Sequence, residues 1–322
     1  MASINLLVIS NPAASHLQVL NKISQPVNMR VGQDQEFARQ EAPNAEVILC
    51  ANFKPEPFRT IFPMAKRLAW VHSSSAGVEN LLFPEFVASP VPLTNGRGVF
   101  KDSLAEFAVS AMLFFVKDLR RMVRNQEAGR WEQFDTRMLS GQRLGIVGYG
   151  EIGRATAQLA RCLGMRVLAM RRQPERSQGD PNVDAVYAPG RLREMLGRCD
   201  FVLVAAPHTP ETRSLIGDAE LRAMKPHAVI INVGRGPVIV EQALIDALEK
   251  GRIGGAALDV FDHEPLPERH PFYHLPNVLL SPHCADHTPG WIEMAMEAFV
   301  ENFERYRNGQ ELKNIVDKKA GY

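Results

Sequence analysis

Residues 144–153 read LGIVGYGEIG, an apolar run that continues into the pattern Gly148-x-Gly150-x-x-Gly153. The run predicts a strand, and the residues after it have the pattern of a helix. In that setting the first glycine allows a tight turn, the second lets a pyrophosphate approach, and the third lets helix pack on strand. The helix N-terminus presents N–H groups and a partial positive charge to phosphates. We therefore predict a dinucleotide-binding turn; the alternative is an ordinary glycine-rich turn.

The rest of the chain repeats this alternation of short apolar runs and helical patterns, which is typical of parallel sheets built from βαβ units. The runs lack strict alternation, as expected of strands that helices cover on both faces. We expect strands at residues 4–10, 46–50, 69–73, 143–148, 166–170, 201–205, 228–232, 255–260 and 277–281. We expect helices at residues 152–163, 240–250 and 289–307.

A length of 322 residues suggests two domains of ordinary size. Asn-Gly-Arg-Gly at residues 95–98 and Ser-Pro-His at residues 281–283 are the candidate boundaries. Because these lie far apart, they predict a discontinuous domain in which the final helix returns to the N-terminal part of the chain.

Composition and residue spacing argue against several kinds of partner and indicate a compartment. The net charge of +1 gives no bulk reason to expect nucleic acid or an anionic membrane. The apolar run 104–116 is too short to span a bilayer, and burial between domains or subunits explains it better. Four scattered cysteines without a CxxC pair indicate reduced thiols in a cytoplasmic protein. No metal is expected, since prolines and loops surround the histidine pairs with i, i+4 spacing.

Three polar side chains directly follow predicted strands: Arg235 in Asn-Val-Gly-Arg-Gly, Glu264 in Asp-His-Glu-Pro, and His283 in Ser-Pro-His. The carboxyl ends of parallel strands share one edge of the sheet, which also carries the glycine turn. Taken singly, these residues could be a surface arginine, a solvated acid and a satisfied loop histidine. Taken together, they are expected to face a bound cofactor.

The chemistry of these three groups fits hydride transfer to a carbonyl. A developing alkoxide needs a proton donor, and histidine titrates in the right range. A carboxylate on the far ring nitrogen favours the imidazolium, and a guanidinium can hold a substrate carboxylate through paired hydrogen bonds. We therefore expect His283 to be the acid, Glu264 its partner and Arg235 the substrate binder.

These motifs make the sequence resemble the D-2-hydroxyacid dehydrogenases over nearly its whole length, most closely the glyoxylate/hydroxypyruvate reductases. The resemblance implies the same roles for Arg235, Glu264 and His283. It also implies that the N–H groups of Ala76 and Gly77, in Ser-Ala-Gly-Val-Glu, bind the substrate carboxylate. The implied fold is α/β with two doubly wound parallel sheets: a Rossmann cofactor domain (residues 99–285) inserted in a discontinuous flavodoxin-like substrate domain (residues 1–98 and 286–322). A homodimer through the apolar helix and its continuation to Trp131 is implied as well.

Some features bear on the subgroup. Glu264 argues against a formate dehydrogenase, because those relatives carry Gln there. Asp286 replaces a more usual small residue and could alter the pocket near His283. Trp291 could reach the substrate or pack in a core.

Some relatives with the same three residues are dinucleotide-sensing corepressors, and this alternative function stays open, although the chain lacks long disordered extensions.

The end of the second cofactor-domain strand predicts NADP, with NAD the less preferred alternative. NAD-selective folds place an acid there to bind the ribose 2′-OH, whereas this strand ends in Arg171-Arg172. Guanidiniums can pair with a 2′-phosphate, or one can lie over the adenine; the alternative is two solvated residues in a turn. The residues expected to contact the cofactor are Gly148, Gly150, Glu151, Ile152, Gly153, Arg171 and Arg172.

Overall fold

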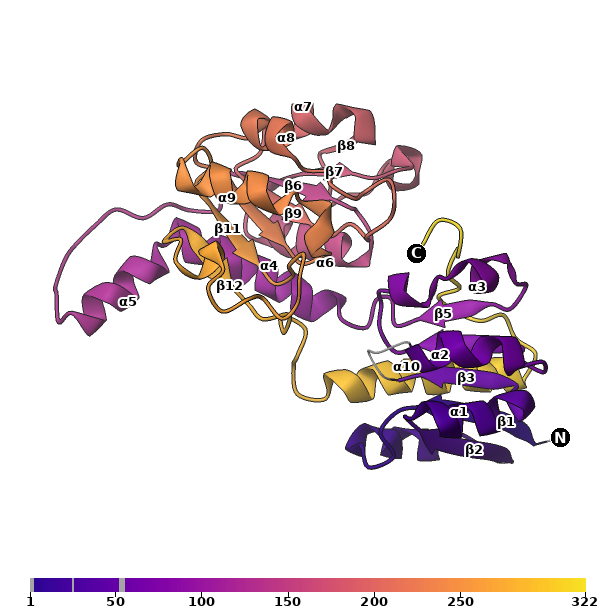
Figure 1. Ribbon diagram of the computed structural model, residues 1–322. Helices are drawn as coiled ribbons and strands as arrows, with labels where there is room; N and C mark the ends of the chain where they lie inside the picture. The colour runs from indigo at the N-terminus through magenta and orange to yellow at the C-terminus, as the bar shows by residue number, and fades with distance from the viewer. Residues whose placement is uncertain (1–2, 25, 52–55) are drawn as a thin grey trace. The chain divides into compact units, whose positions relative to one another are not determined.

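The computed structural model describes residues 3–24, 26–51 and 56–322. The chain forms two compact units, of which the first contains Met1–Phe100 and Pro289–Tyr322 and the second Lys101–Thr288 (Figure 1). The first unit is thus discontinuous, as predicted.

The boundaries of the units differ from the predicted ones, after residues 98 and 285, by two short segments. Phe100 belongs to the first unit, where its ring lies 6.0 Å from that of Trp291. Residues 286–288 stay with the second unit, in which the His287 N–H donates to the Cys284 carbonyl at 3.0 Å.

The first unit contains a five-stranded parallel sheet in the order β2-β1-β3-β4-β5. This is the flavodoxin-like doubly wound order, which confirms the predicted fold class. β3 and β4 are buried along their whole length, because the sheet is covered on both faces. The strands are β1 (Ile4–Ile9), β2 (Val27–Gly32), β3 (Val47–Cys50), β4 (Trp70–Ser73) and β5 (Leu93–Asn95).

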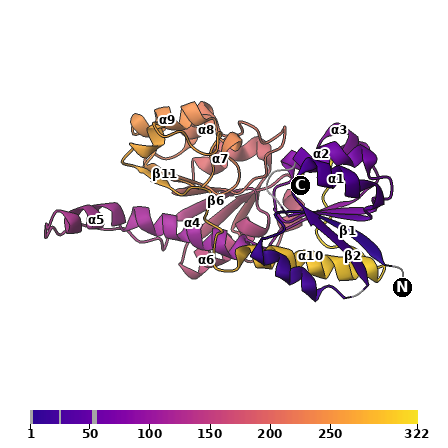
Figure 2. The ribbon, with the colours of Figure 1, turned by 60° about the horizontal axis from the view of Figure 1, so that its bottom comes forward.

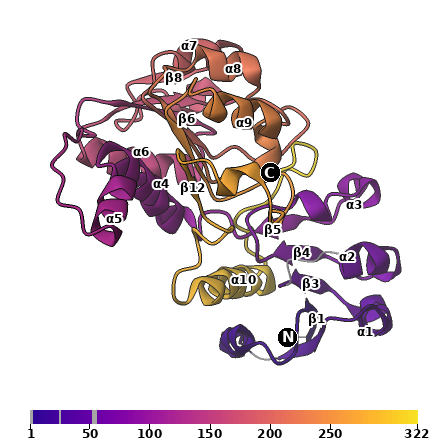
Figure 3. The ribbon, with the colours of Figure 1, turned by 60° about the vertical axis from the view of Figure 1, so that its left-hand side comes forward.

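Successive side chains of these strands point to opposite faces and enter two separate cores. Leu6 and Trp70 share one core with Phe299, whose ring stacks on Trp70 at 5.4 Å. Leu7 lies in the other core with Phe58. Figure 3 shows α10 on one face of the sheet and the three shorter helices on the other. These helices are α1 (Gln35–Glu41), α2 (Glu56–Ile61), α3 (Pro84–Ala88) and α10 (Trp291–Arg307).

The second unit contains a seven-stranded parallel sheet in the order β12-β11-β10-β9-β6-β7-β8. The chain runs outward from β6 through β7 to β8, then continues from β9 on the other side of β6. This is the Rossmann arrangement, in which ligands bind outside the carboxyl ends of the strands where the order reverses. The strands are β6 (Arg143–Val147), β7 (Arg166–Met170), β8 (Ala185–Tyr187), β9 (Phe201–Val204), β10 (Val229–Asn232), β11 (Gly255–Leu258) and β12 (Val278–Leu280).

Helices cover both faces of the second sheet (Figure 2). α4 packs against α6 and β10, while α7, α8 and α9 contribute apolar side chains to the core of the opposite face. Within the described ranges, no helix has the length and apolar character needed to cross a membrane. The helices are α4 (Lys101–Val116), α5 (Leu119–Glu127), α6 (Glu151–Cys162), α7 (Leu192–Leu196), α8 (Asp218–Ala223) and α9 (Glu241–Glu249).

Candidate active site

The glycine turn joins β6 to α6 as the sequence predicts. Gly148 has φ of 94°, a left-handed conformation that favours glycine. A Cβ on Gly153 would lie 2.9 Å from the Gly148 carbonyl oxygen, so helix and strand approach as closely as the motif requires. A Cβ on Gly150 would meet no described atom within 4 Å. Gly148 thus adopts the turn conformation expected of it, Gly153 lets the helix pack closely on the strand, and Gly150 borders open space.

The start of α6 can accept an anion. Its first N–H groups, at Glu151 and Ile152, have no partner within the helix. Gly150 is the N-cap residue, and the described structure records no side-chain cap there. A phosphate group would satisfy these donors and interact favourably with the helix dipole.

The backbone of Ala206, just beyond β9, fits between two glycine turns. A Cβ on Gly148 would lie 2.6 Å from the Ala206 nitrogen, and a Cβ on Gly234 would lie 2.7 Å from the Ala206 oxygen. The loops that follow β6, β9 and β10 are thus in contact at the carboxyl edge of the second sheet.

Arg235 follows β10 at this carboxyl edge. Asn232 shapes the turn, because its Oδ1 accepts from the Gly234 N–H at 3.1 Å and its Nδ2 donates to the Arg235 carbonyl at 3.1 Å. The Arg235 guanidinium is half-buried, and its Nη1 donates to the Gly234 carbonyl at 2.8 Å. A Cβ on Gly236 would lie 2.0 Å from the Phe261 carbonyl carbon, so this turn packs directly on the loop after β11.

His283 and Glu264 form an ion pair at the same edge. His283 Nδ1 lies 2.7 Å from Glu264 Oε2, and Glu264 Oε1 accepts from the Phe261 N–H at 2.9 Å. Because an ionised carboxylate only accepts, Nδ1 carries the proton and Nε2 faces away from the pair. The structure thus brings together the acid–base pair expected from the sequence.

The two members of the pair shift each other's pKa toward the charged forms. The hydrogen bond with Glu264 raises the pKa of His283 above its ordinary value, while burial and Arg235 oppose this. Burial raises the pKa of Glu264, but the hydrogen bonds from His283 and Phe261 outweigh it, so the pKa is lowered. Both groups are therefore charged over a wider range around neutral pH than either would be alone.

Asp259 holds the loop that carries His283, a role that sequence reasoning missed. Its carboxylate is buried, and Oδ1 accepts from Ser281 Oγ at 2.5 Å and from the Cys284 and Ala285 N–H groups at 3.0 and 3.1 Å. His283 lies between these anchors with φ of 52°, in the left-handed region. An acid directly after the apolar run of β11 was the available signal.

Asp286 and Trp291 lie close to this loop in the sequence. Burial raises the pKa of Asp286, and its Oδ1 accepts no hydrogen bond from the described residues, although His287 Nε2 lies 3.8 Å away. Trp291 contacts Phe100 within the first unit, which favours packing for at least part of its ring.

The two arginines after β7 differ in their surroundings. Arg171 is half-buried, and its Nη1 donates to Ser177 Oγ at 2.6 Å. Arg172 is exposed; the hydrogen bond from Thr209 is the main cause that lowers the pKa of Glu211, and the charge of Arg172 adds to it. Both follow the strand beside the glycine turn, because β7 pairs with β6.

Ala76 and Gly77 belong to a fixed turn in the first unit. Asn95 Nδ2 donates to the Ala76 carbonyl at 2.6 Å, and the Gly96 N–H donates to the Ser75 carbonyl at 3.1 Å. A Cβ on Gly96 would lie 2.5 Å from the Ser74 oxygen. The turn therefore packs closely on the end of β5.

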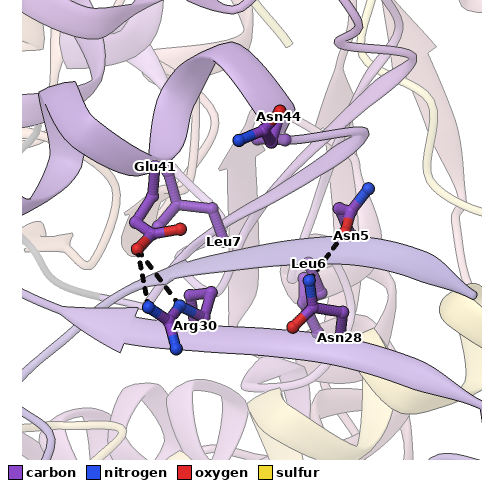
Figure 4. A pocket seen from close by; sticks show the side chains of 8 residues that line it. Asn5, Leu6, Leu7, Asn28, Arg30, Glu41 and Asn44 are labelled. Atoms are coloured by element: carbon purple, nitrogen blue, oxygen red, sulfur yellow. Dashed lines mark hydrogen bonds and ion pairs between the residues drawn. The ribbon is translucent and has the colours of Figure 1, made fainter.

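The described residues give little support for a second ligand pocket or for a metal site. A hollow of about 140 Å³ lies beside β1 and β2, but its polar groups pair with one another (Figure 4). Arg30 Nη2 donates to Glu41 Oε1 at 3.0 Å, and Asn28 Nδ2 donates to Asn5 Oδ1 at 2.8 Å. No group of three His, Cys, Asp or Glu residues suited to a metal occurs in the part of the chain that the structure describes.

A family model and a curated relative both match this chain, and they point to the same kind of protein. The family model described as D-isomer specific 2-hydroxyacid dehydrogenase, NAD binding domain, matches residues 109–285. The chain is 34% identical over 271 residues to the glyoxylate reductase of Thermococcus gammatolerans, an alignment that covers 81% of this chain and 79% of the relative.

Solved structures show the same architecture. A D-isomer specific 2-hydroxyacid dehydrogenase from Xanthobacter autotrophicus Py2, in complex with NADPH and MES, has a TM-score of 0.83 and 28% identity over 100% of both chains. The NADPH-dependent glyoxylate/hydroxypyruvate reductase of Sinorhizobium meliloti, in complex with NADP and sulfate, has a TM-score of 0.86 over 100% of both chains. At 24% identity, the second likeness shows the shared fold.

Proposed function

The chain belongs to the D-isomer specific 2-hydroxyacid dehydrogenases, and on that premise we propose that it reduces a small 2-oxo acid with NADPH. The product is the D-2-hydroxy acid, and glyoxylate and hydroxypyruvate are the first candidate substrates. The observation that carries this proposal is the pair of His283 and Glu264, 2.7 Å apart, at the carboxyl edge of a Rossmann sheet.

The cofactor occupies the crevice outside β6, β9 and β10 in this proposal. The open space at Gly150 and the N–H groups of Glu151 and Ile152 fit a pyrophosphate. When bound, a reduced nicotinamide supplies the hydride that reduces the carbonyl carbon.

His283 serves as the general acid. Its Nδ1 is fixed by Glu264, so Nε2 is left to donate a proton to the alkoxide that forms on the substrate oxygen. Asp259 keeps the imidazole in place through the backbone of the next two residues. These contacts support a donor that is positioned before the substrate arrives.

Arg235 and the turn of Ala76 and Gly77 bind the substrate carboxylate in this proposal. The guanidinium offers paired, charge-assisted hydrogen bonds. The Ala76 and Gly77 N–H groups offer further donors, and Asn95 supports the turn that carries them by donating to the Ala76 carbonyl.

We propose NADPH rather than NADH because Arg171 and Arg172 stand where an NAD-selective fold has an acid. Comparing kcat/KM for NADPH and NADH in the wild type and in Arg171→Ala/Arg172→Ala tests this. A loss of the NADPH preference in the double variant supports it. A wild type that prefers NADH contradicts it.

We also propose a cytoplasmic homodimer that associates through α4 and α5. Figure 2 shows α5 continuing beyond α4, away from the sheet of its own unit. Several apolar side chains on α5 and in the segment after it are exposed, including Trp131 at 94% and Met138 at 69%, which fits a surface that a second copy covers. The four cysteines form no disulfide among the described residues, which fits the reducing compartment proposed here.

The substrate is tested by steady-state oxidation of NADPH with glyoxylate, hydroxypyruvate and phenylpyruvate. Turnover of at least one of these supports an enzyme and separates it from a dinucleotide-sensing binding protein. Tight binding of NADPH without turnover of any 2-oxo acid would favour the binding protein.

A further inference from the structure

Tyr149 stands between the first two glycines of the turn and reaches a second loop. Its ring is buried, with 2% exposure, and its hydroxyl donates to Asp180 Oδ2 at 2.9 Å. Asp180 lies in the loop that connects β7 to β8. One hydrogen bond thus joins the glycine turn to the loop that begins with the two arginines.

Asp180 in turn orders its own loop. Oδ1 accepts from the Asn182 N–H at 3.0 Å, and the Asp180 N–H donates to the Ser177 carbonyl at 3.2 Å. Ser177 is buried, and its Oγ accepts from Arg171 Nη1 at 2.6 Å. The contacts therefore run without interruption from Tyr149 through Asp180 and Ser177 to the Arg171 guanidinium.

The charge states of the pair favour a persistent bond. Burial and the neighbouring carboxylate raise the pKa of Tyr149, so the phenol stays a donor. Burial raises the pKa of Asp180, but hydrogen bonds from Asn182 and Tyr149 outweigh it and the pKa is lowered. The cations Arg154 and Arg171 lower the pKa of Tyr149 but do not outweigh burial and the neighbouring carboxylate. The Arg154 guanidinium lies 6.0 Å from the centre of the Tyr149 ring.

The Tyr149 hydroxyl is not needed to bury the ring, so it has another role. A phenylalanine would bury the same ring without needing a polar partner, whereas a buried tyrosine hydroxyl must find one. The partner here is a charged group in the arginine-bearing loop, which gives the hydroxyl a role in placing that loop.

We propose that Tyr149 and Asp180 are positioning residues that hold Arg171 where it can bind the 2′-phosphate of NADPH. The inference rests on the proposed NADPH preference. Neither residue contacts the cofactor in this account. Their hydrogen bond sets the distance between the turn that binds the pyrophosphate and the arginine that binds the 2′-phosphate, so it acts on dinucleotide selectivity rather than on the chemical step.

The test compares Tyr149→Phe with a matched control, Tyr187→Phe. Tyr187 is also a buried tyrosine of this unit, and its backbone carbonyl accepts from the Arg171 N–H at 3.2 Å. Tyr187→Phe keeps that backbone contact and removes only the hydroxyl, which accepts from Arg198 at 2.5 Å and lies outside the network. Dissociation constants for NADPH and NADH are measured by fluorescence titration, together with kcat for glyoxylate. Tyr149→Phe should weaken NADPH binding roughly three- to tenfold, which is less than the full loss of a hydrogen bond to a charged group, because the change reaches the 2′-phosphate only through the position of Arg171. NADH binding and kcat should be unchanged. Tyr187→Phe should change none of them.

Asp180→Ala provides a second route if Tyr149→Phe does not fold. It should weaken NADPH binding selectively, and the double variant should bind NADPH no more weakly than Asp180→Ala alone, because both changes remove one bond. Equal weakening of NADPH and NADH, or unchanged NADPH binding in both single variants, would overturn the inference. A wild type that prefers NADH would instead overturn the proposed cofactor preference, and it is visible before any variant is made.

Discussion

Changing Glu264 to Gln removes the charge beside His283 but preserves the shape of the side chain. The glutamine oxygen can still accept from Phe261 or from His283, but not from both in the present geometry, since Glu264 uses one oxygen for each. The imidazolium thus loses a charged partner 2.7 Å away, and its pKa falls toward the ordinary value.

The size of the effect follows from the strength and exposure of this bond. A hydrogen bond to a charged group contributes about 1.5–3 kcal/mol when it is shielded from water. The side chains of His283 and Glu264 are 44% and 34% exposed, so we discount this for solvent screening to about 1 kcal/mol. That corresponds to roughly a fivefold change in the ratio of imidazolium to imidazole.

The sign of the pH dependence is fixed by which form of His283 acts. Only the protonated imidazole donates, so the rate of reduction is highest at low pH and falls as the pH rises through the raised pKa. With the pKa lowered, Glu264→Gln should begin its fall at lower pH. It should therefore be roughly fivefold slower than the wild type on the alkaline side, with little change on the acid plateau.

The assay is kcat/KM for glyoxylate with saturating NADPH from about pH 5.5 to about pH 9, across the range in which histidines titrate. Glu241→Gln is the matched control, because Glu241 pairs with His270 Nε2 at 3.1 Å elsewhere in the same unit. Its pH profile should match that of the wild type. A Glu264→Gln profile that also matched the wild type would refute the coupling of Glu264 to His283.

Three further substitutions distinguish effects on ligand binding from effects on the free energy of unfolding. Arg235→Lys keeps the charge but loses the planar fork, so KM for the 2-oxo acid should rise strongly while NADPH affinity stays close to normal; equal weakening of both would indicate a structural role. Gly153→Ala should lower the free energy of unfolding by about 1–3 kcal/mol in thermal or urea denaturation, because its Cβ would lie 2.9 Å from the Gly148 oxygen and 3.0 Å from Ile146 Cγ2. Gly150→Ala should change that free energy by less than about 0.5 kcal/mol, since no described atom lies near its Cβ, yet weaken NADPH binding in a titration; normal binding would place the pyrophosphate elsewhere.

Much of the fold could be predicted from the sequence because buried parallel strands are continuous apolar runs. Each strand expected from such a run is present, with ends that differ by a residue or two. The strands that were missed, β2, β5 and β8, all lie at sheet edges. β2 alternates exposed Asn28 and Arg30 with less exposed apolar residues, and β5 and β8 have three residues each, so none has the run that marks a strand covered on both faces.

The candidate site could be predicted in part, for a related reason. The position after a parallel strand determines which edge a residue occupies, so Arg235, Glu264 and His283 could be placed together before their distances were known. The supports of the site depend on contacts between distant segments. An acid directly after β11 marks Asp259 as a candidate, but no local pattern shows that it reaches the His283 loop 25 positions later. Tyr149 likewise reaches Asp180 across 31 positions of sequence.

The central claim is that His283 donates a proton during reduction of a 2-oxo acid. The most direct measurement is kcat for glyoxylate with saturating NADPH in the wild type and in His283→Ala, after circular dichroism has shown that both are folded. The account predicts that the wild type turns over and that His283→Ala is slower by roughly 10²–10⁴-fold, with NADPH affinity retained. Near-normal turnover in His283→Ala would contradict it.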